Sequence, residues 1–207
     1  PVPEYGIVNG YTSDSYLVST FRTLNKEDET PIEFTKIEAP GCMDLIYFTE
    51  DINTSRTNED RLSIKRAIFM AEGTQITRKG YVAGPEAYKI WGNLLGNIET
   101  KLDAFGNSYL IDCYWEAKRV SEEYLLRLAT RYADSPQALE LQAASKTYGQ
   151  IEKMFEKLAQ LFPFFSENHN ADLIEKNRKQ AEKILLECYP LEKKGIDHLQ
   201  KAITVWQ

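Results

Sequence analysis

The chain has 207 residues, of which 43% are hydrophobic and 27% charged, as is ordinary for a globular protein and unlike a disordered one. Its formal net charge of −6, without a cluster of Lys and Arg, argues against a nucleic-acid partner, because phosphate binding needs a basic face. The sequence contains no apolar run near twenty residues and no signal-peptide pattern, so it predicts no membrane span and a cytoplasmic protein.

The N-terminal part has the composition of β-strands. Short runs of apolar and β-branched residues alternate with Gly, Asp, Asn and Pro turns, which predicts a small antiparallel sheet of three or four strands. Pro1 leads straight into the first run without an initiator Met, so we expect the chain to begin inside a domain. The alternative is that Pro1 is the true start and the hairpin caps a bundle. The predicted strands are 6–10, 16–18, 32–37 and 45–48.

Beyond residue 55 the chain is predicted to be helical. The first helix carries carboxylates in its first turn and stops at Gly73, while Pro85 occupies the first position of the second. Phe105 and Gly106 are predicted to end the second helix, and Asn107 to begin the third. The three expected ranges are 60–72, 85–104 and 107–132.

The most regular apolar pattern begins after Ser135-Pro136, where seven apolar residues recur at steps of three and four between Leu141 and Phe162. Two further helices are expected at 171–189 and 191–206, separated by a break at Pro190. The pattern predicts an antiparallel helical bundle, although the same seam is compatible with a homodimer. The fold class is therefore α+β, predominantly α, with a β region at 1–54 and a helical region at 55–207.

No cofactor or metal site is expected. Three widely spaced cysteines suit reduced thiols better than disulfides, and neither His169 nor His198 stands at ligand spacing. The stretch from Gly80 to Gly84 lacks the Lys-Ser/Thr that grips phosphate. Each histidine is read as an exposed or capping residue, and Cys113 as a small buried hydrophobe unless Glu116 or Lys118 shares a pocket with it.

Aromatic residues are abundant in the helical region. We expect most of them to fill the core and a subset to line a ligand pocket, because Tyr and Trp combine apolar area with a polar group. They are Tyr81, Tyr88, Trp91, Tyr109, Tyr114, Trp115, Tyr124, Tyr132 and Tyr148.

Six segments in order along the chain resemble one protein family. They are Pro3–Tyr11, Tyr16–Val18, Ala67–Ala71, Gly84–Trp91, Tyr109–Arg119 and Leu161–Phe164. The family is that of the bacteriocin-processing-peptidase-like, papain-type proteins with a C-terminal helical region, related to the butirosin-biosynthesis acyltransferase. The resemblance implies that residues 1–54 are part of a papain-like domain.

The resemblance also implies where a catalytic site would lie. In papain-type domains the nucleophilic Cys sits on a helix that would precede Pro1, the base His would stand at Tyr5, and the orienting Asp near Ser19 and Thr20. These positions hold no imidazole and no carboxylate here. Without the base a thiolate is not generated, so we expect this polypeptide not to hydrolyse peptides.

Two functional hypotheses follow. The first is the C-terminal part of an acyltransferase, or of a protein that processes amides or thioesters, lacking its catalytic Cys segment. Under this first hypothesis a carrier protein would be the acyl donor. The second hypothesis is a non-enzymatic module that binds a small molecule or a protein through its helical face. For a pocket where sheet and bundle meet, the candidate residues are Tyr5, Tyr11, Cys113 and Glu116.

Overall fold

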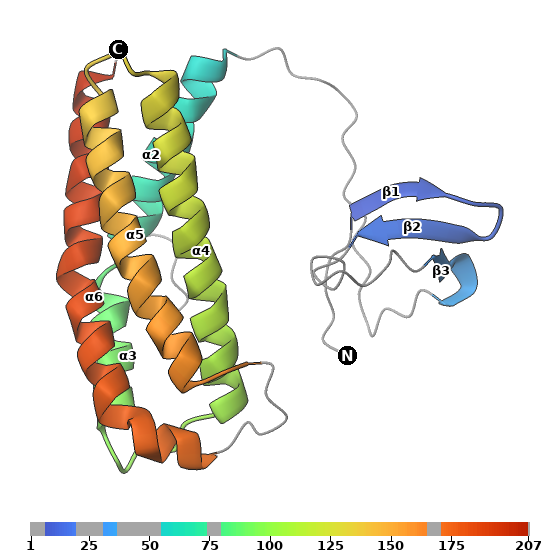
Figure 1. Cartoon of the computed structure of the whole chain (residues 1–207), viewed down its shortest axis with the longest axis vertical. Coiled ribbons are helices and arrows are strands. Elements are labelled where there is room, and N and C mark those ends of the chain that lie inside the picture. The colour runs from blue at the N-terminus through green and yellow to red at the C-terminus, as the bar shows by residue number, and fades with distance from the viewer. Residues whose placement is uncertain (1–6, 20–30, 37–54, 74–79, 165–170, 207) are drawn as a thin grey trace. The chain divides into compact units, whose positions relative to one another are not determined.

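The computed structural model describes residues 7–19, 31–36, 55–73, 80–164 and 171–206. The chain divides into two compact units, Pro1–Asn53 and Thr54–Gln207. The described elements are a small antiparallel sheet in the first unit and helices in the second (Figure 1), which confirms the predicted fold class of α+β, mainly α.

The N-terminal unit contains a three-stranded sheet in the order β1-β2-β3, with both pairings antiparallel. The turn between the first two strands is closed by a hydrogen bond of 2.8 Å from the Thr12 amide to the Ser15 carbonyl. The third strand is shorter than predicted because its second half forms a 3₁₀ turn, and the predicted strand at 45–48 lies outside the described residues. The elements are β1 Ile7–Tyr11, β2 Ser15–Ser19, β3 Ile32–Glu33 and η1 Phe34–Lys36.

The helical unit is an antiparallel bundle of the four-helix type, and each of its four helical positions is here called a column. Three long helices, α4, α5 and α6, each fill a column, and the shorter α2 and α3 follow one another along the fourth, both packed on α6 (Figure 1). The bounds are α2 Arg56–Glu72, α3 Glu86–Gly96, α4 Ala104–Arg131, α5 Ala138–Leu161 and α6 Ala171–Val205.

The core is centred on α5, which packs against α4 and α6. Its regular apolar seam, including Leu141, Ile151, Phe155 and Leu158, is completely buried within the single chain. Burial of this stripe supplies most of the stability of such helices, because the hydrophobic effect stabilises by about 25 cal/mol per Å² of apolar surface removed from water.

Several predicted helix boundaries are wrong. The helix predicted at 60–72 begins at Arg56, and the helix predicted at 85–104 ends at Gly96. Phe105 and Gly106 do not end a helix but lie in the first turn of α4, where Asp103 is the N-cap and accepts a hydrogen bond of 3.1 Å from the Phe105 amide. Pro190 does not break the chain, since α6 continues through it. The apolar stripe is buried on both sides of Pro190, at Cys188 and at Leu199, and this packing outweighs the lost backbone hydrogen bond.

The connection from α2 to α3 depends on glycines with positive φ. Gly73 ends α2 in the left-handed conformation at φ 68°, as the sequence predicts. Gly84 also has a positive φ of 70°, and a Cβ at this position would lie 1.9 Å from the carbonyl oxygen of Ala71. Only Gly therefore fits at residue 84, where the chain passes close to the end of α2.

We expect Gly84→Ala to destabilise the helical unit by about 3 kcal/mol, since it adds a backbone clash to the cost of a left-handed non-Gly residue. Gly80→Ala is the matched control, because Gly80 has a φ of 94° but a Cβ there meets nothing within 4 Å. The control should lose only about 1 kcal/mol. Urea unfolding followed by far-UV circular dichroism measures both, and equal losses would show that the contact with Ala71 is unimportant.

Candidate functional site

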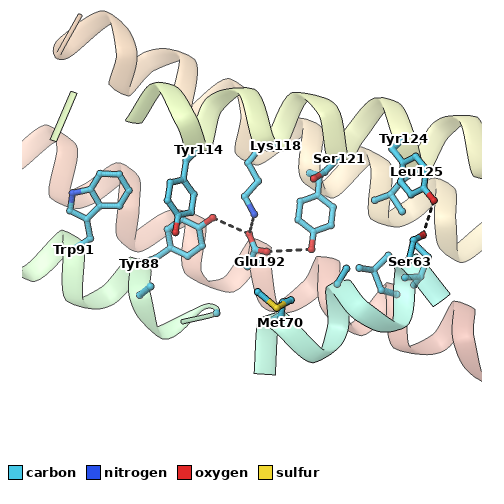
Figure 2. Close-up of a pocket in the computed structure, with 17 residues that line it drawn as sticks. Ser63, Met70, Tyr88, Trp91, Tyr114, Lys118, Ser121, Tyr124, Leu125 and Glu192 are labelled. Carbon is cyan, nitrogen blue, oxygen red and sulfur yellow. Dashed lines mark hydrogen bonds and ion pairs between the residues drawn. The ribbon is translucent and has the colours of Figure 1, made fainter. Parts of the chain in front are cut away.

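A pocket of about 320 Å³ lies inside the helical unit, where α2 gives way to α3. Its walls come from all five helices (Figure 2). The size is at the lower end of the range for small-molecule sites. Its main apolar side chains are Ile64, Met70, Leu125 and Leu199; its aromatic ones are Tyr88, Trp91, Tyr114, Tyr124 and Tyr148.

An ion pair occupies the centre of the pocket wall. Lys118 projects from α4 toward Glu192 on α6, and the two charged atoms, Nζ and Oε2, are 2.6 Å apart (Figure 2). The two side chains are only 12% and 9% exposed. At this depth each charge has lost most of its hydration, so the pair is tolerated because the partners compensate one another.

Two tyrosine hydroxyls complete the surroundings of the carboxylate. Tyr88 donates to Glu192 Oε2 at 3.0 Å and Tyr148 donates to Oε1 at 3.3 Å. The Lys118 ammonium also lies 4.9 Å from the centre of the Tyr148 ring, a cation–π distance. The carboxylate of Glu192 therefore receives three hydrogen bonds from three different helices, α3, α4 and α5.

The local electrostatics keep these phenols protonated. Burial, followed by the negative charge of Glu192, raises the pKa of Tyr88 and that of Tyr148 well above 10. The same two causes raise the pKa of Tyr114. The hydroxyls of Tyr88, Tyr114 and Tyr148 thus stay protonated and available as donors throughout the neutral pH range.

The sequence places both charges on apolar stripes. Glu192 continues the buried face of α6 between Cys188 and Leu199, and Lys118 continues the face of α4 between Ile111 and Leu125. At both positions the 3.6-residue period predicts an apolar residue. A charged residue there is the sequence signal that identifies this pair.

A glycine makes room for one of the tyrosines. At Gly195, one turn after Glu192 on α6, a Cβ would lie 3.1 Å from the Tyr148 ring. The ring thus reaches the carboxylate by passing directly over the backbone of α6.

Polar contacts hold α2 against α4 at the edge of the pocket. The hydroxyls of Ser63 and Tyr124 are 2.7 Å apart, and the buried Asp60 accepts from Tyr132 at 2.8 Å and pairs with Arg131. These contacts fix the wall that α2 contributes.

The residues singled out from the sequence lie elsewhere. Tyr5 is outside the described residues, and Tyr11 is 77% exposed on β1. Cys113 is exposed on α4, so the expectation that it is a buried hydrophobe is wrong. Glu116, also exposed, lies 3.8 Å from Arg119. Tyr11, Cys113 and Glu116 do not line this pocket, and their role in any other site stays a prediction.

Five of the nine aromatics line the pocket, while the expectation that they bind a ligand there stays a prediction. Tyr114 stacks on Phe155 with ring centres 5.7 Å apart, which joins the pocket to the core. Sequence reasoning weighed Lys118 only as a neighbour of Cys113 and missed Glu192 completely.

The two described thiols differ sharply in environment. Burial raises the pKa of Cys188 to about 12, although the Lys118 ammonium acts in the opposite direction. We expect iodoacetamide at pH 8 to alkylate Cys113 in the native protein and to leave Cys188 unmodified, because the thiolate is the reactive species. Peptide mass spectrometry after the reaction distinguishes them. Rapid alkylation of Cys188 would mean that the packing around this part of α6 opens readily.

Metal sites, membrane-spanning helices and the two histidines can be considered for the part of the chain that the structure describes. No group of three potential metal ligands occurs there, and none of the helices found there is long and apolar enough to cross a membrane. His198 is partly buried, and its Nδ1 lies 2.6 Å from Glu140 Oε2, so a contact with Glu140 holds it instead of leaving it freely exposed. His169 lies outside the described residues.

Comparison with known proteins gives no information on the role of this pocket. No family model, curated protein or solved structure matches this chain.

Proposed function

We propose that the helical unit is a binding module for a small organic molecule, which occupies the pocket between α2, α3 and the three long helices. The observation that carries the proposal is the Lys118–Glu192 pair facing a pocket of about 320 Å³ whose other walls are largely apolar and aromatic. Small-molecule sites combine such walls with a few well-placed polar groups.

The energetics favour a ligand site over simple packing. A buried ion pair rarely stabilises a fold more than apolar residues of the same volume would, so packing alone does not explain its presence. A bound molecule would contact the apolar and aromatic walls and use the polar groups of the pair.

The position of the pocket supports the same conclusion. It lies where one column of the bundle changes from α2 to α3, and α4, α5 and α6 contribute Tyr114, Lys118, Tyr148 and Glu192 to its walls. Spaces between the helices of a bundle are frequent ligand sites.

The test uses fluorinated aromatic probes and a variant that fills the pocket. We expect ¹⁹F NMR to show exchange broadening of 4-fluoroacetophenone in the presence of the protein. Ala67 is an exposed pocket residue on α2, so Ala67→Trp should abolish the broadening without unfolding the chain. Lys65→Trp is the matched control, since Lys65 is exposed on the same helix but does not line the pocket. Equal broadening with both variants would refute the proposal.

The acyl-transfer or amide-processing role remains a proposal about the parent protein that the family resemblance implies. It concerns a catalytic Cys expected ahead of Pro1, and the pocket described above neither requires it nor replaces it. Binding of an acyl carrier protein would belong to that same proposal.

A further inference from the structure

Two donor groups in the pocket, those of Lys118 and Tyr114, are not saturated by the described residues. A lysine ammonium has three N–H donors, and Lys118 directs one of them at Glu192 Oε2. Among the described residues no other acceptor bonds to its Nζ, and the hydroxyl of Tyr114, which projects from α4 one turn away, makes no hydrogen bond with them. Both groups line the pocket.

The acceptors at the pocket centre, in contrast, are already used. A carboxylate has about four lone-pair positions, and Glu192 accepts from Lys118, Tyr88 and Tyr148. The hydroxyls of Ser63 and Tyr124 bond to each other. A ligand that brings an acceptor therefore gains a hydrogen bond from a charged donor here, whereas one that brings only donors meets a carboxylate that is mostly occupied and the neutral hydroxyl oxygens of the lining.

Charge balance restricts the ligand further. Lys118 and Glu192 neutralise one another in a site where charges are poorly hydrated. A cationic ligand would meet the Lys118 ammonium, and an anionic ligand would lie beside the Glu192 carboxylate, so either one leaves a charge uncompensated. An uncharged ligand does not.

We propose that the ligand of this pocket is an uncharged and mainly apolar molecule with a carbonyl oxygen. This inference rests on the proposed function. The ligand's oxygen accepts from the Lys118 ammonium and the Tyr114 hydroxyl, and its apolar body lies against the aromatic and aliphatic walls. Hydrogen bonds to a charged donor are the stronger kind, which makes Lys118 the main determinant of specificity.

The experiment compares two probes of the same shape. 4-Fluoroacetophenone carries a carbonyl where 4-fluoro-α-methylstyrene carries a C=CH₂ group. Their dissociation constants are measured by ¹⁹F NMR for the wild type and for the double variant Lys118→Met with Glu192→Gln, which removes both charges together and keeps an acceptor for the two tyrosines. The double variant should weaken binding of the ketone about tenfold and change that of the styrene less than twofold.

Further probes and a measurement on the wild type complete the test. 4-Fluorobenzamidine and 4-fluorobenzoate have nearly the shape of the ketone, with a positive and a negative charge respectively, and both should bind more weakly than it does. The infrared carbonyl stretch of the bound ketone should move to lower frequency than in an apolar solvent, because its oxygen accepts hydrogen bonds. This measurement needs no variant, so it decides the matter even where the double variant does not fold.

The outcomes separate the two proposals. An unshifted carbonyl stretch, tighter binding of either charged probe, or a ketone affinity unaffected by the double variant would overturn the ligand class while the pocket still binds. Failure of every probe to bind in a manner blocked by Ala67→Trp would overturn the proposed function and this inference with it.

Discussion

Replacing Lys118 by Met should destabilise the helical unit by about 4 kcal/mol, because it leaves the Glu192 carboxylate buried without its counter-charge. Methionine retains most of the apolar stem, so the loss reports the charge and not a cavity. The two tyrosine hydroxyls still donate to Glu192, but neutral donors do not compensate a buried negative charge. Guanidinium unfolding monitored by circular dichroism gives the free energy of unfolding.

Two variants control this result. Lys183→Met removes a lysine whose side chain is 78% exposed and lies 3.9 Å from Glu187, so it should change stability by less than about 0.5 kcal/mol. The double variant Lys118→Met with Glu192→Gln should recover most of the stability, because no uncompensated charge remains. A single variant as stable as the wild type would show that Glu192 is well hydrated, contrary to the description of the pocket.

Replacing Arg178 by Ala should destabilise the helical unit by about 3 kcal/mol, because three backbone carbonyls lose a charged donor. The buried guanidinium of Arg178, on α6, donates to the carbonyls of Leu95, Asn97 and Thr100 at 3.1, 2.8 and 2.8 Å. These carbonyls lie at and just after the C-terminal end of α3, where a helix leaves its last acceptors unpaired. Arg178 thereby fixes the end of a helix that lines the pocket.

Chemical unfolding and hydrogen exchange test this role together. Lys179→Ala, at the exposed neighbouring position, should have little effect on either. Arg178→Lys keeps the charge but lacks the planar fork, so it should recover only part of the lost stability. Faster exchange should appear first at the amides in the last turn of α3. A loss spread evenly over all helices, without early exchange there, would contradict the assignment of Arg178 to this helix end.

The sequence predicts the helices well where their apolar period is strong. The seam from Leu141 to Phe162 is buried as expected, and Gly73 ends α2 in the left-handed conformation. The predicted boundaries are wrong at Phe105-Gly106 and at Pro190. At the first, the local N-cap at Asp103 outweighs the glycine, and at the second, burial of both halves of α6 outweighs the proline.

The site is harder to predict because its members are distant in the sequence. Tyr88, Lys118, Tyr148 and Glu192 come from four helices and meet only when the bundle forms. Cys113 stands out in the sequence for its aromatic neighbours, yet it lies on an exposed face of α4, whereas the next residue, Tyr114, lines the pocket. A single step along a helix turns a side chain by about 100°, so proximity in sequence does not identify the pocket face.

The measurement that tests the central claim most directly is a titration of the ¹⁵N-labelled protein with 4-fluoroacetophenone, followed by two-dimensional ¹H–¹⁵N NMR. A ligand pocket among α2, α3 and α4 predicts saturable shifts concentrated at amides around Ala67, Gly84, Ala87 and Lys118. Absence of saturable shifts up to the solubility limit of the probe, or shifts confined to residues outside the pocket, would contradict the account.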